Sequence, residues 1–120
     1  MRRAFLAAAV LWLGLSSAAF AQDVGGRYEV RGTNNLDGSP YSGTAVITRT
    51  SNSTCRIRWS TGSVSEGICM LANNSFAAAY RMEGAFGLVV YELRRDGRLD
   101  GVWTIADRSG AGTEVLTPIR

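Results

Sequence analysis

The stretch from Cys55 to Cys69 constrains the fold more than any other part of the chain. After Cys55, the apolar residues Ile57 and Trp59 alternate with arginines, which is the period-2 pattern of a strand with one apolar face. A turn centred on Gly62 folds this strand back onto the run that ends at Cys69. The two cysteines then face each other in an antiparallel pair, close enough for a disulfide. The stretch therefore predicts a β-hairpin closed by a Cys55–Cys69 disulfide.

The same register brings two further complementary pairs together. Ile57 lies opposite the small Gly67, and on the other face Arg58 lies opposite Glu66. Three agreements in one register support both the hairpin and the disulfide. Because the chain has only two cysteines, a disulfide between them indicates an oxidising compartment.

The first 21 residues have the layout of a secretory signal peptide. A positively charged start is followed by an apolar run, Ala4 to Leu15, and by the cleavage pattern Ala19-Phe20-Ala21. The apolar run is shorter than the roughly 20 residues that span a bilayer. We therefore expect a signal peptide at 1–21 and a single domain at 22–120. That domain should be periplasmic or secreted, with no membrane anchor after cleavage.

The charged residues exclude several classes of function. Without Arg2 and Arg3, 11 arginines remain against 10 acids, scattered along the chain without the basic stripe that nucleic acid requires. The chain has no histidine and no lysine, which removes common general bases. The cysteines are assigned to a disulfide and the acids are not clustered. We therefore expect no nucleic-acid contact, no metal site, no cofactor and no enzymatic activity.

The rest of the chain reads as short strands separated by turns. Turn signals such as Asp37-Gly38, Asn73-Asn74 and Asp96-Gly97 divide runs of alternating or β-branched residues. The pattern predicts an all-β domain of about eight antiparallel strands, with no helical period after the leader. Consecutive hairpins favour an up-and-down barrel, and a two-sheet β-sandwich is the alternative that the pattern leaves open.

Four aromatic residues lie on the apolar side of their strands: Tyr28, Trp59, Phe76 and Trp103. They either fill the core of the barrel or line a cavity for a small apolar ligand, as in lipocalin-like barrels. Glu92 is an acid within an apolar strand. A two-residue turn at Asp96-Gly97 places it opposite Gly101, where we expect it to be solvated.

The run from Phe86 to Arg94 is the most apolar strand after the leader. If Leu88, Val90 and Trp103 point inward, neighbouring apolar side chains must point outward. An apolar outer stripe of this kind indicates contact with a partner chain or a second copy. Four residues form the expected stripe: Val89, Tyr91, Leu93 and Val102.

Two groups of turn and strand residues also carry a family resemblance. The first is Tyr28-x-Val30-x-Gly32-Thr33-Asn34 with Asp37-Gly38-Ser39-Pro40-Tyr41-x-Gly43. The second is Val90-Tyr91-Glu92 with Asp96-Gly97-x-Leu99-x-Gly101-x-Trp103-Thr104 and Gly112-Thr113-Glu114-x-Leu116-Thr117. Over most of the chain after the leader they resemble small exported bacterial β-barrel proteins, of lipocalin or avidin-like meander, often labelled fibronectin-binding. The resemblance implies an extracellular-matrix ligand and supplies no catalytic residues.

These observations give one leading hypothesis and two alternatives. The leading hypothesis is a non-catalytic exported β-barrel that binds another protein, or itself, through an outer strand face. The first alternative is a small-ligand carrier of the lipocalin or avidin kind, which needs an open cavity near Trp59 and Trp103. The second is an inhibitor of an exported protease.

Overall fold

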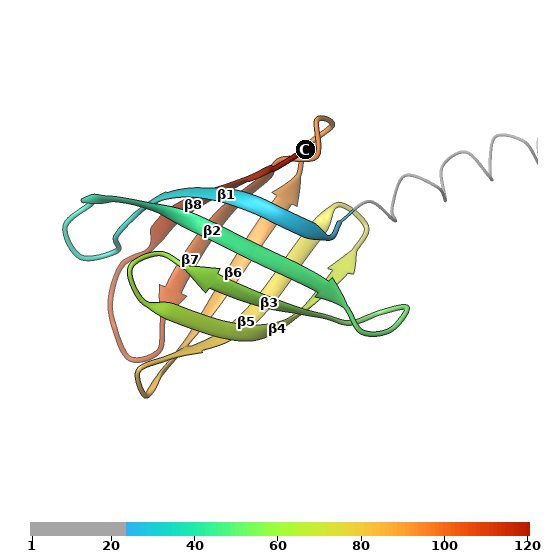
Figure 1. The fold of residues 1–120 in the computed structure, drawn as a ribbon. Coiled ribbons are helices and arrows are strands. Elements are labelled where there is room, and N and C mark those ends of the chain that lie inside the picture. The colour runs from blue at the N-terminus through green and yellow to red at the C-terminus, as the bar shows by residue number, and fades with distance from the viewer. Residues whose placement is uncertain (1–23) are drawn as a thin grey trace, which may run out of the picture.

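The computed structural model describes residues 24–120, so the expected signal peptide at 1–21 lies outside the described residues. The described chain consists of strands and connecting loops (Figure 1). The eight strands are β1 (Gly26–Thr33), β2 (Pro40–Arg49), β3 (Cys55–Ser60), β4 (Val64–Ala72), β5 (Ser75–Met82), β6 (Ala85–Leu93), β7 (Leu99–Ile105) and β8 (Gly112–Pro118). Residues 24–120 contain no helix long and apolar enough to cross a bilayer.

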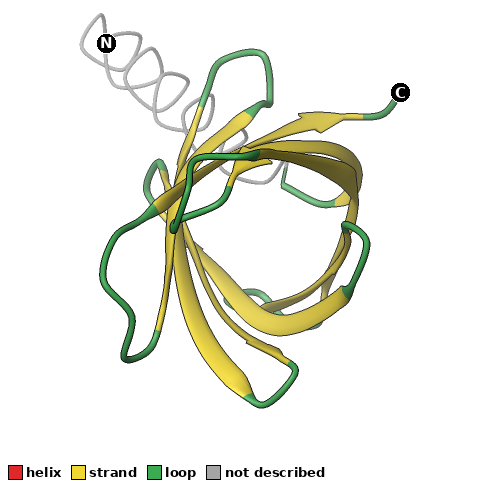
Figure 2. Ribbon diagram, turned by 90° about the vertical axis from the view of Figure 1, so that its left-hand side faces the viewer, coloured by secondary structure: helices red, strands yellow, loops and turns green. Residues whose placement is uncertain are grey.

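The strands form a closed barrel in which each strand pairs with its neighbours in sequence (Figure 2). Closure is made by β8, which pairs antiparallel with β1 and places Leu116 opposite Val30. All the pairings in the barrel are antiparallel, and the closure leaves no unpaired sheet edge. The predicted all-β up-and-down barrel is confirmed, and the two-sheet sandwich is excluded.

The β3–β4 hairpin has the register predicted from the sequence. Cys55 pairs with Cys69, Ile57 with Gly67 and Arg58 with Glu66. The two cysteines form a disulfide across Cα atoms 5.0 Å apart, which is compatible with an exported protein. The Arg58 guanidinium and the Glu66 carboxylate form an exposed ion pair at 2.8 Å.

Removing the disulfide should lower the free energy of unfolding by about 2–3 kcal/mol, because the reduced unfolded chain regains the freedom of the closed loop. The measurement is urea denaturation with and without reductant, followed by circular dichroism. A Cys55→Ala/Cys69→Ala variant is the control, since reductant should not change its midpoint. Equal midpoints for the oxidised and reduced wild type would contradict the prediction.

The core lies towards the end of the barrel that carries the disulfide and the C-terminus (Figure 1). Its fully buried side chains come from alternate positions of six strands: Tyr28, Val30, Ile57, Phe76, Val89, Tyr91, Leu99 and Leu116. Tyr28, expected in the core or in a cavity, belongs to this core, and its hydroxyl accepts a hydrogen bond from the Gly25 N–H at 3.0 Å.

The predicted orientation of β6 is wrong. Val89 and Tyr91 are almost completely buried, and Leu93 is half-buried against the core. These three residues therefore point inward, and of the expected outer stripe only Val102 faces solvent.

The cause is the length of the β6–β7 loop. A two-residue turn at Asp96-Gly97 was expected, but the loop spans residues 94–98 and pairs Leu93 with Leu99. Tyr91 rather than Glu92 therefore lies opposite Gly101. A one-residue change of register turns every side chain of a strand to the other face. Glu92 is exposed, as expected, and pairs with Arg94 at 3.0 Å.

Candidate functional site

One end of the barrel is open and holds a cavity of about 240 Å³. It is the end where the β1–β2, β3–β4, β5–β6 and β7–β8 hairpins turn, on the left of Figure 1 and facing the viewer in Figure 2. Four aromatic side chains and one acid line the cavity, and we call this group the aromatic mouth: Tyr41, Trp59, Tyr80, Trp103 and Glu114. The structure thus places Trp59 and Trp103 on a cavity, at the opposite end from Tyr28.

Glu114 is a buried acid, with 6% of its surface exposed. Its carboxylate accepts three hydrogen bonds from aromatic side chains. The Tyr41 hydroxyl donates to Oε1 at 2.7 Å, the Trp59 indole N–H donates to Oε2 at 2.9 Å, and the Tyr91 hydroxyl also donates to Oε2. Burial of a carboxylate without such donors would be strongly unfavourable. These three donors therefore hold the acid inside the barrel.

Two glycines make room for this arrangement. Glu114 on β8 lies between Gly32 on β1 and Gly101 on β7. A Cβ atom at Gly32 would overlap the Tyr41 ring, and a Cβ atom at Gly101 would overlap the Tyr91 ring. Both rings therefore lie over a glycine backbone, and their hydroxyls reach the carboxylate between them.

The other rings of the mouth are fixed in a similar way. The Tyr80 ring lies over Gly87, and its hydroxyl donates to the Thr104 carbonyl oxygen at 2.9 Å. The Trp103 ring lies over Gly112, and its indole N–H donates to the Thr113 carbonyl oxygen at 3.3 Å. With their polar tips engaged by the protein, both rings present mainly apolar surface to the cavity.

The rings also contact one another edge to face. Trp59 packs on Tyr80 with centroids 5.3 Å apart and planes at 64°, and Tyr41 packs on Trp103 at 6.3 Å and 70°. Such edge-to-face pairs are favourable because the positive edge of one ring meets the negative face of the other. The mouth is therefore a preformed aromatic site with a carboxylate at its base.

The site changes the acidity of its phenols. Burial, reinforced by the nearby Glu114 carboxylate, raises the pKa of Tyr80 from about 10 to about 12. The same two causes raise the pKa of Tyr41 and of Tyr91 well above 10. All three phenols therefore stay protonated in the folded barrel at a pH where the unfolded chain has begun to ionise.

Stability should fall as the pH rises above about 10. The unfolded chain then releases phenol protons that the folded barrel retains, so this contribution is fully present below pH 10 and is lost towards pH 12 and beyond. The measurement is the urea midpoint as a function of alkaline pH. Tyr80→Phe should flatten the dependence, and a wild-type midpoint that stays constant up to pH 12 would contradict the prediction.

No protein-family model matches the chain, and none of the curated proteins does. Solved structures do match. A redesigned β-barrel, b11L5F_LGL, has a TM-score of 0.71 at 15% identity, over 80% of this chain and 91% of its own. The redesigned β-barrel mFAP1 bound to DFHBI has a TM-score of 0.70 at 16% identity, over 82% and 97%. The REP1-NXSQ fatty acid transporter has a TM-score of 0.53 at 12% identity, over 83% and 98%.

These likenesses show the fold. At this level of identity they carry no residue-by-residue correspondence with the aromatic mouth. The resemblance to proteins labelled fibronectin-binding stays a prediction, and so does the protease-inhibitor alternative.

Most of the site was not predicted from the sequence. Trp59 and Trp103 were expected in the core or at a cavity, whereas Tyr41 and Glu114 were named only within the family resemblance and Tyr80 was not named as a site residue. One signal was available for the acid: Glu114 lies two residues before Leu116 and so shares its inward face. Among residues 24–120, no group of three or more histidines, cysteines or acids is arranged to hold a metal ion.

The barrel also has an apolar outer face. It covers β4 to β7 in two cross-strand rows, one joining Ile68 to Leu88 through Ala79 and one joining Met70 to Val102 through Ala77 and Val90. Its large apolar side chains are each about half exposed or more: Ile68, Met70, Phe86, Leu88, Val90 and Val102. An apolar outer stripe was expected, and the structure places it on the opposite set of β6 residues.

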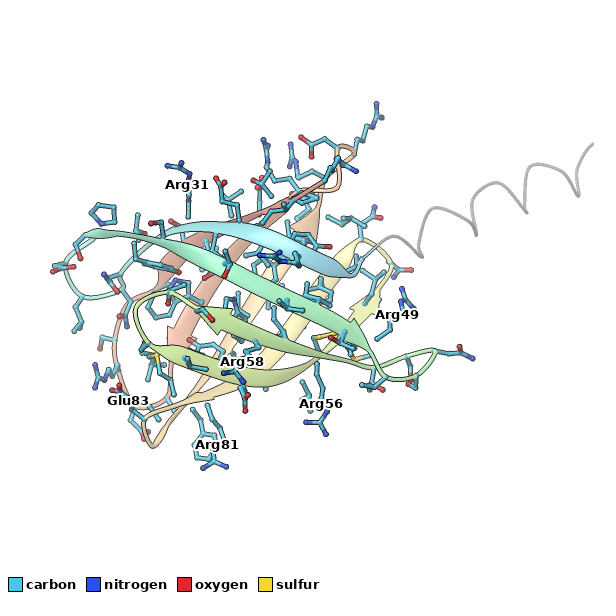
Figure 3. The ribbon with its side chains drawn as sticks, viewed as in Figure 1. Arg31, Arg49, Arg56, Arg58, Arg81 and Glu83 are labelled. Atoms are coloured by element: carbon cyan, nitrogen blue, oxygen red, sulfur yellow. A yellow bond between two sulfur atoms is a disulfide. The ribbon has the colours of Figure 1, made fainter. Side chains whose placement is uncertain are left out.

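Arginines border this outer face. Arg56 and Arg58 on β3 and Arg81 on β5 point away from the barrel on the same side (Figure 3). Arg81 stacks over the Phe86 ring at 5.7 Å from its centroid, while Arg58 pairs with Glu66. The border of the face therefore carries charges of both signs.

Proposed function

We propose that this protein is a non-catalytic barrel that binds a small ligand in the aromatic mouth. One observation carries the proposal: a buried carboxylate and four aromatic rings line a cavity at the end of the barrel opposite its fully buried core. Ligand sites of this kind are concave and mostly apolar, with a few fixed polar groups that orient the ligand.

The size and rigidity of the mouth support this role. Its volume of about 240 Å³ is somewhat below the range of roughly 300–1,000 Å³ usual for drug-sized ligands, which favours a smaller molecule. Each ring is held by a hydrogen bond and lies against another ring, so little ordering is needed on binding. Among the similar structures, mFAP1 holds a small molecule and REP1-NXSQ is a fatty acid transporter.

The proposal assigns no catalysis to Glu114. General acid–base catalysis most often uses histidine, and the chain has no histidine and no lysine. The carboxylate is also held by three donors, which suits a fixed recognition group.

The test is a fragment screen by ligand-observed NMR with the purified protein and two serine variants. Ser65→Leu fills the mouth, because Ser65 is buried and lines the cavity. Ser60→Leu makes the same change on the exposed face of the same hairpin and is the matched control. We expect fragments that bind the wild type and Ser60→Leu but not Ser65→Leu. Binding that persists in Ser65→Leu, or no binding to the wild type, would overturn the proposal.

A second candidate function is self-association through the apolar outer face. The exposed rows over β4 to β7 form a continuous apolar surface, and exposed apolar surfaces of this kind mark contacts between protein chains. Because the border carries both Arg81 and Glu66, a second copy related by a two-fold axis can match unlike charges.

Leu88→Asp should weaken this association by about tenfold or more, since it buries a charge in an apolar contact. Sedimentation equilibrium measures the effect, with Thr117→Asp on the outer face of β8 as the matched control. A wild type that stays monomeric, or a Leu88→Asp variant that associates like the wild type, would rule out this second function.

A further inference from the structure

The charge inside the mouth is not balanced by a cation of the protein. Glu114 receives its three hydrogen bonds from neutral groups, the Tyr41 and Tyr91 hydroxyls and the Trp59 indole. None of the described residues that line the cavity is an arginine. Within the described residues, the acid in the cavity is therefore hydrogen-bonded by neutral groups and is not paired with a cation.

The carboxylate keeps some accepting capacity. Its two oxygens together offer about four acceptor positions, and three of them are used. Oε2 accepts from both Trp59 and Tyr91, whereas Oε1 accepts from Tyr41 alone. A hydrogen-bond donor or a cationic group on a ligand therefore finds the more available acceptor at Oε1.

The rings around the carboxylate favour the same kind of ligand. The faces of Trp and Tyr rings are electron-rich and attract a cation within about 6 Å of the ring centroid. The polar tips of Tyr80 and Trp103 donate to backbone carbonyl oxygens, so they are not free to donate to an anionic ligand. The mouth thus combines negative ring faces with a carboxylate and lacks a basic residue.

We propose that the mouth selects small organic cations, in which a quaternary or protonated ammonium group packs against the aromatic rings with its charge balanced by Glu114. This inference rests on the proposed function and names its ligand class. It also separates this barrel from a carrier of fatty acids, because the carboxylate of a fatty acid would meet the Glu114 carboxylate without a cation between them.

The test compares three small probes: a cation, its neutral isostere and a linear anion. Choline carries a trimethylammonium group. Its neutral isostere, with carbon in place of nitrogen, is 3,3-dimethyl-1-butanol, called dimethylbutanol below. Hexanoate is an anion. Trp59 and Trp103 both line the cavity, so tryptophan fluorescence reports binding in the mouth. We expect choline to bind about tenfold or more tighter than dimethylbutanol, and hexanoate to bind weakest.

Two variants separate charge from shape. Glu114→Gln should remove most of the preference for choline over dimethylbutanol, leaving the part that the ring faces supply, and should leave dimethylbutanol binding nearly unchanged. Trp103→Leu keeps apolar contact but removes a ring face, so it too should weaken choline more than dimethylbutanol. Ser60→Leu, on the outside of the barrel, should bind all three probes like the wild type.

The outcomes distinguish this inference from the proposed function. If dimethylbutanol or hexanoate binds as tightly as choline, and Ser65→Leu abolishes that binding, the mouth is a ligand site but the preference for cations is refuted. Choline affinity that is equal in the wild type and Glu114→Gln also refutes it. If choline does not bind at all, the inference fails, while the proposed function is still decided by the fragment screen.

Discussion

Replacement of Glu114 by alanine is expected to lower the free energy of unfolding by about 4 kcal/mol. The substitution removes the acceptor for two donors in nearly inaccessible positions, the Trp59 indole N–H and the Tyr91 hydroxyl. Each buried donor left without a partner costs about 1–3 kcal/mol, and the lost side chain adds a cavity. The measurement is urea denaturation followed by far-ultraviolet circular dichroism, which reports mainly on the strands.

Glu114→Gln is the matched control for this prediction. Its amide oxygen can accept from Trp59 and Tyr91, and its amide nitrogen can donate to the Tyr41 hydroxyl, so the hydrogen bonds survive without the charge. We expect it to lose less than half of what the alanine variant loses. If both variants unfold at the wild-type midpoint, Glu114 does not organise the mouth.

The β3–β4 hairpin could be predicted because several local signals fix one register. The cysteines, the Ile57–Gly67 pair and the Arg58–Glu66 pair are different kinds of complementarity, and a shift by one residue would break all of them. Short turns between successive strands likewise favoured consecutive antiparallel pairing and hence the closed barrel.

The β6–β7 hairpin had no comparable set of independent signals for its register. Leu88, Val89 and Val90 are apolar in succession, so the strand has no period-2 signal to choose its inner face. The orientation then depended entirely on the expected turn at Asp96-Gly97, and the longer loop reversed it. The buried position of Glu114 could not be predicted for a related reason. An acid on an inward position is unfavourable until its donors are known, and Tyr41, Trp59 and Tyr91 lie 73, 55 and 23 residues before Glu114 in the sequence.

Replacement of Gly67 by alanine is expected to destabilise the barrel by about 3 kcal/mol or more. Gly67 on β4 pairs with Tyr80 on β5, and a Cβ atom there would overlap the carbonyl oxygen of Ala79. A rotamer change cannot relieve overlap with a backbone atom, so the two strands must move apart where they pair. Urea denaturation measures the loss, and circular dichroism shows whether the variant keeps its strands.

Alanine substitutions at two further glycines provide comparisons for this loss of stability. Gly84, in the β5–β6 turn, has a φ of 82° and open space around its Cβ position, so Gly84→Ala should cost only about 1 kcal/mol of backbone strain. At Gly101 the overlap is with the Tyr91 ring, which can shift at the expense of its hydrogen bond to Glu114. We therefore expect the loss to be smallest at Gly84, larger at Gly101 and largest at Gly67. Equal losses at Gly67 and Gly84 would mean that the close approach of β4 and β5 does not require a glycine at position 67.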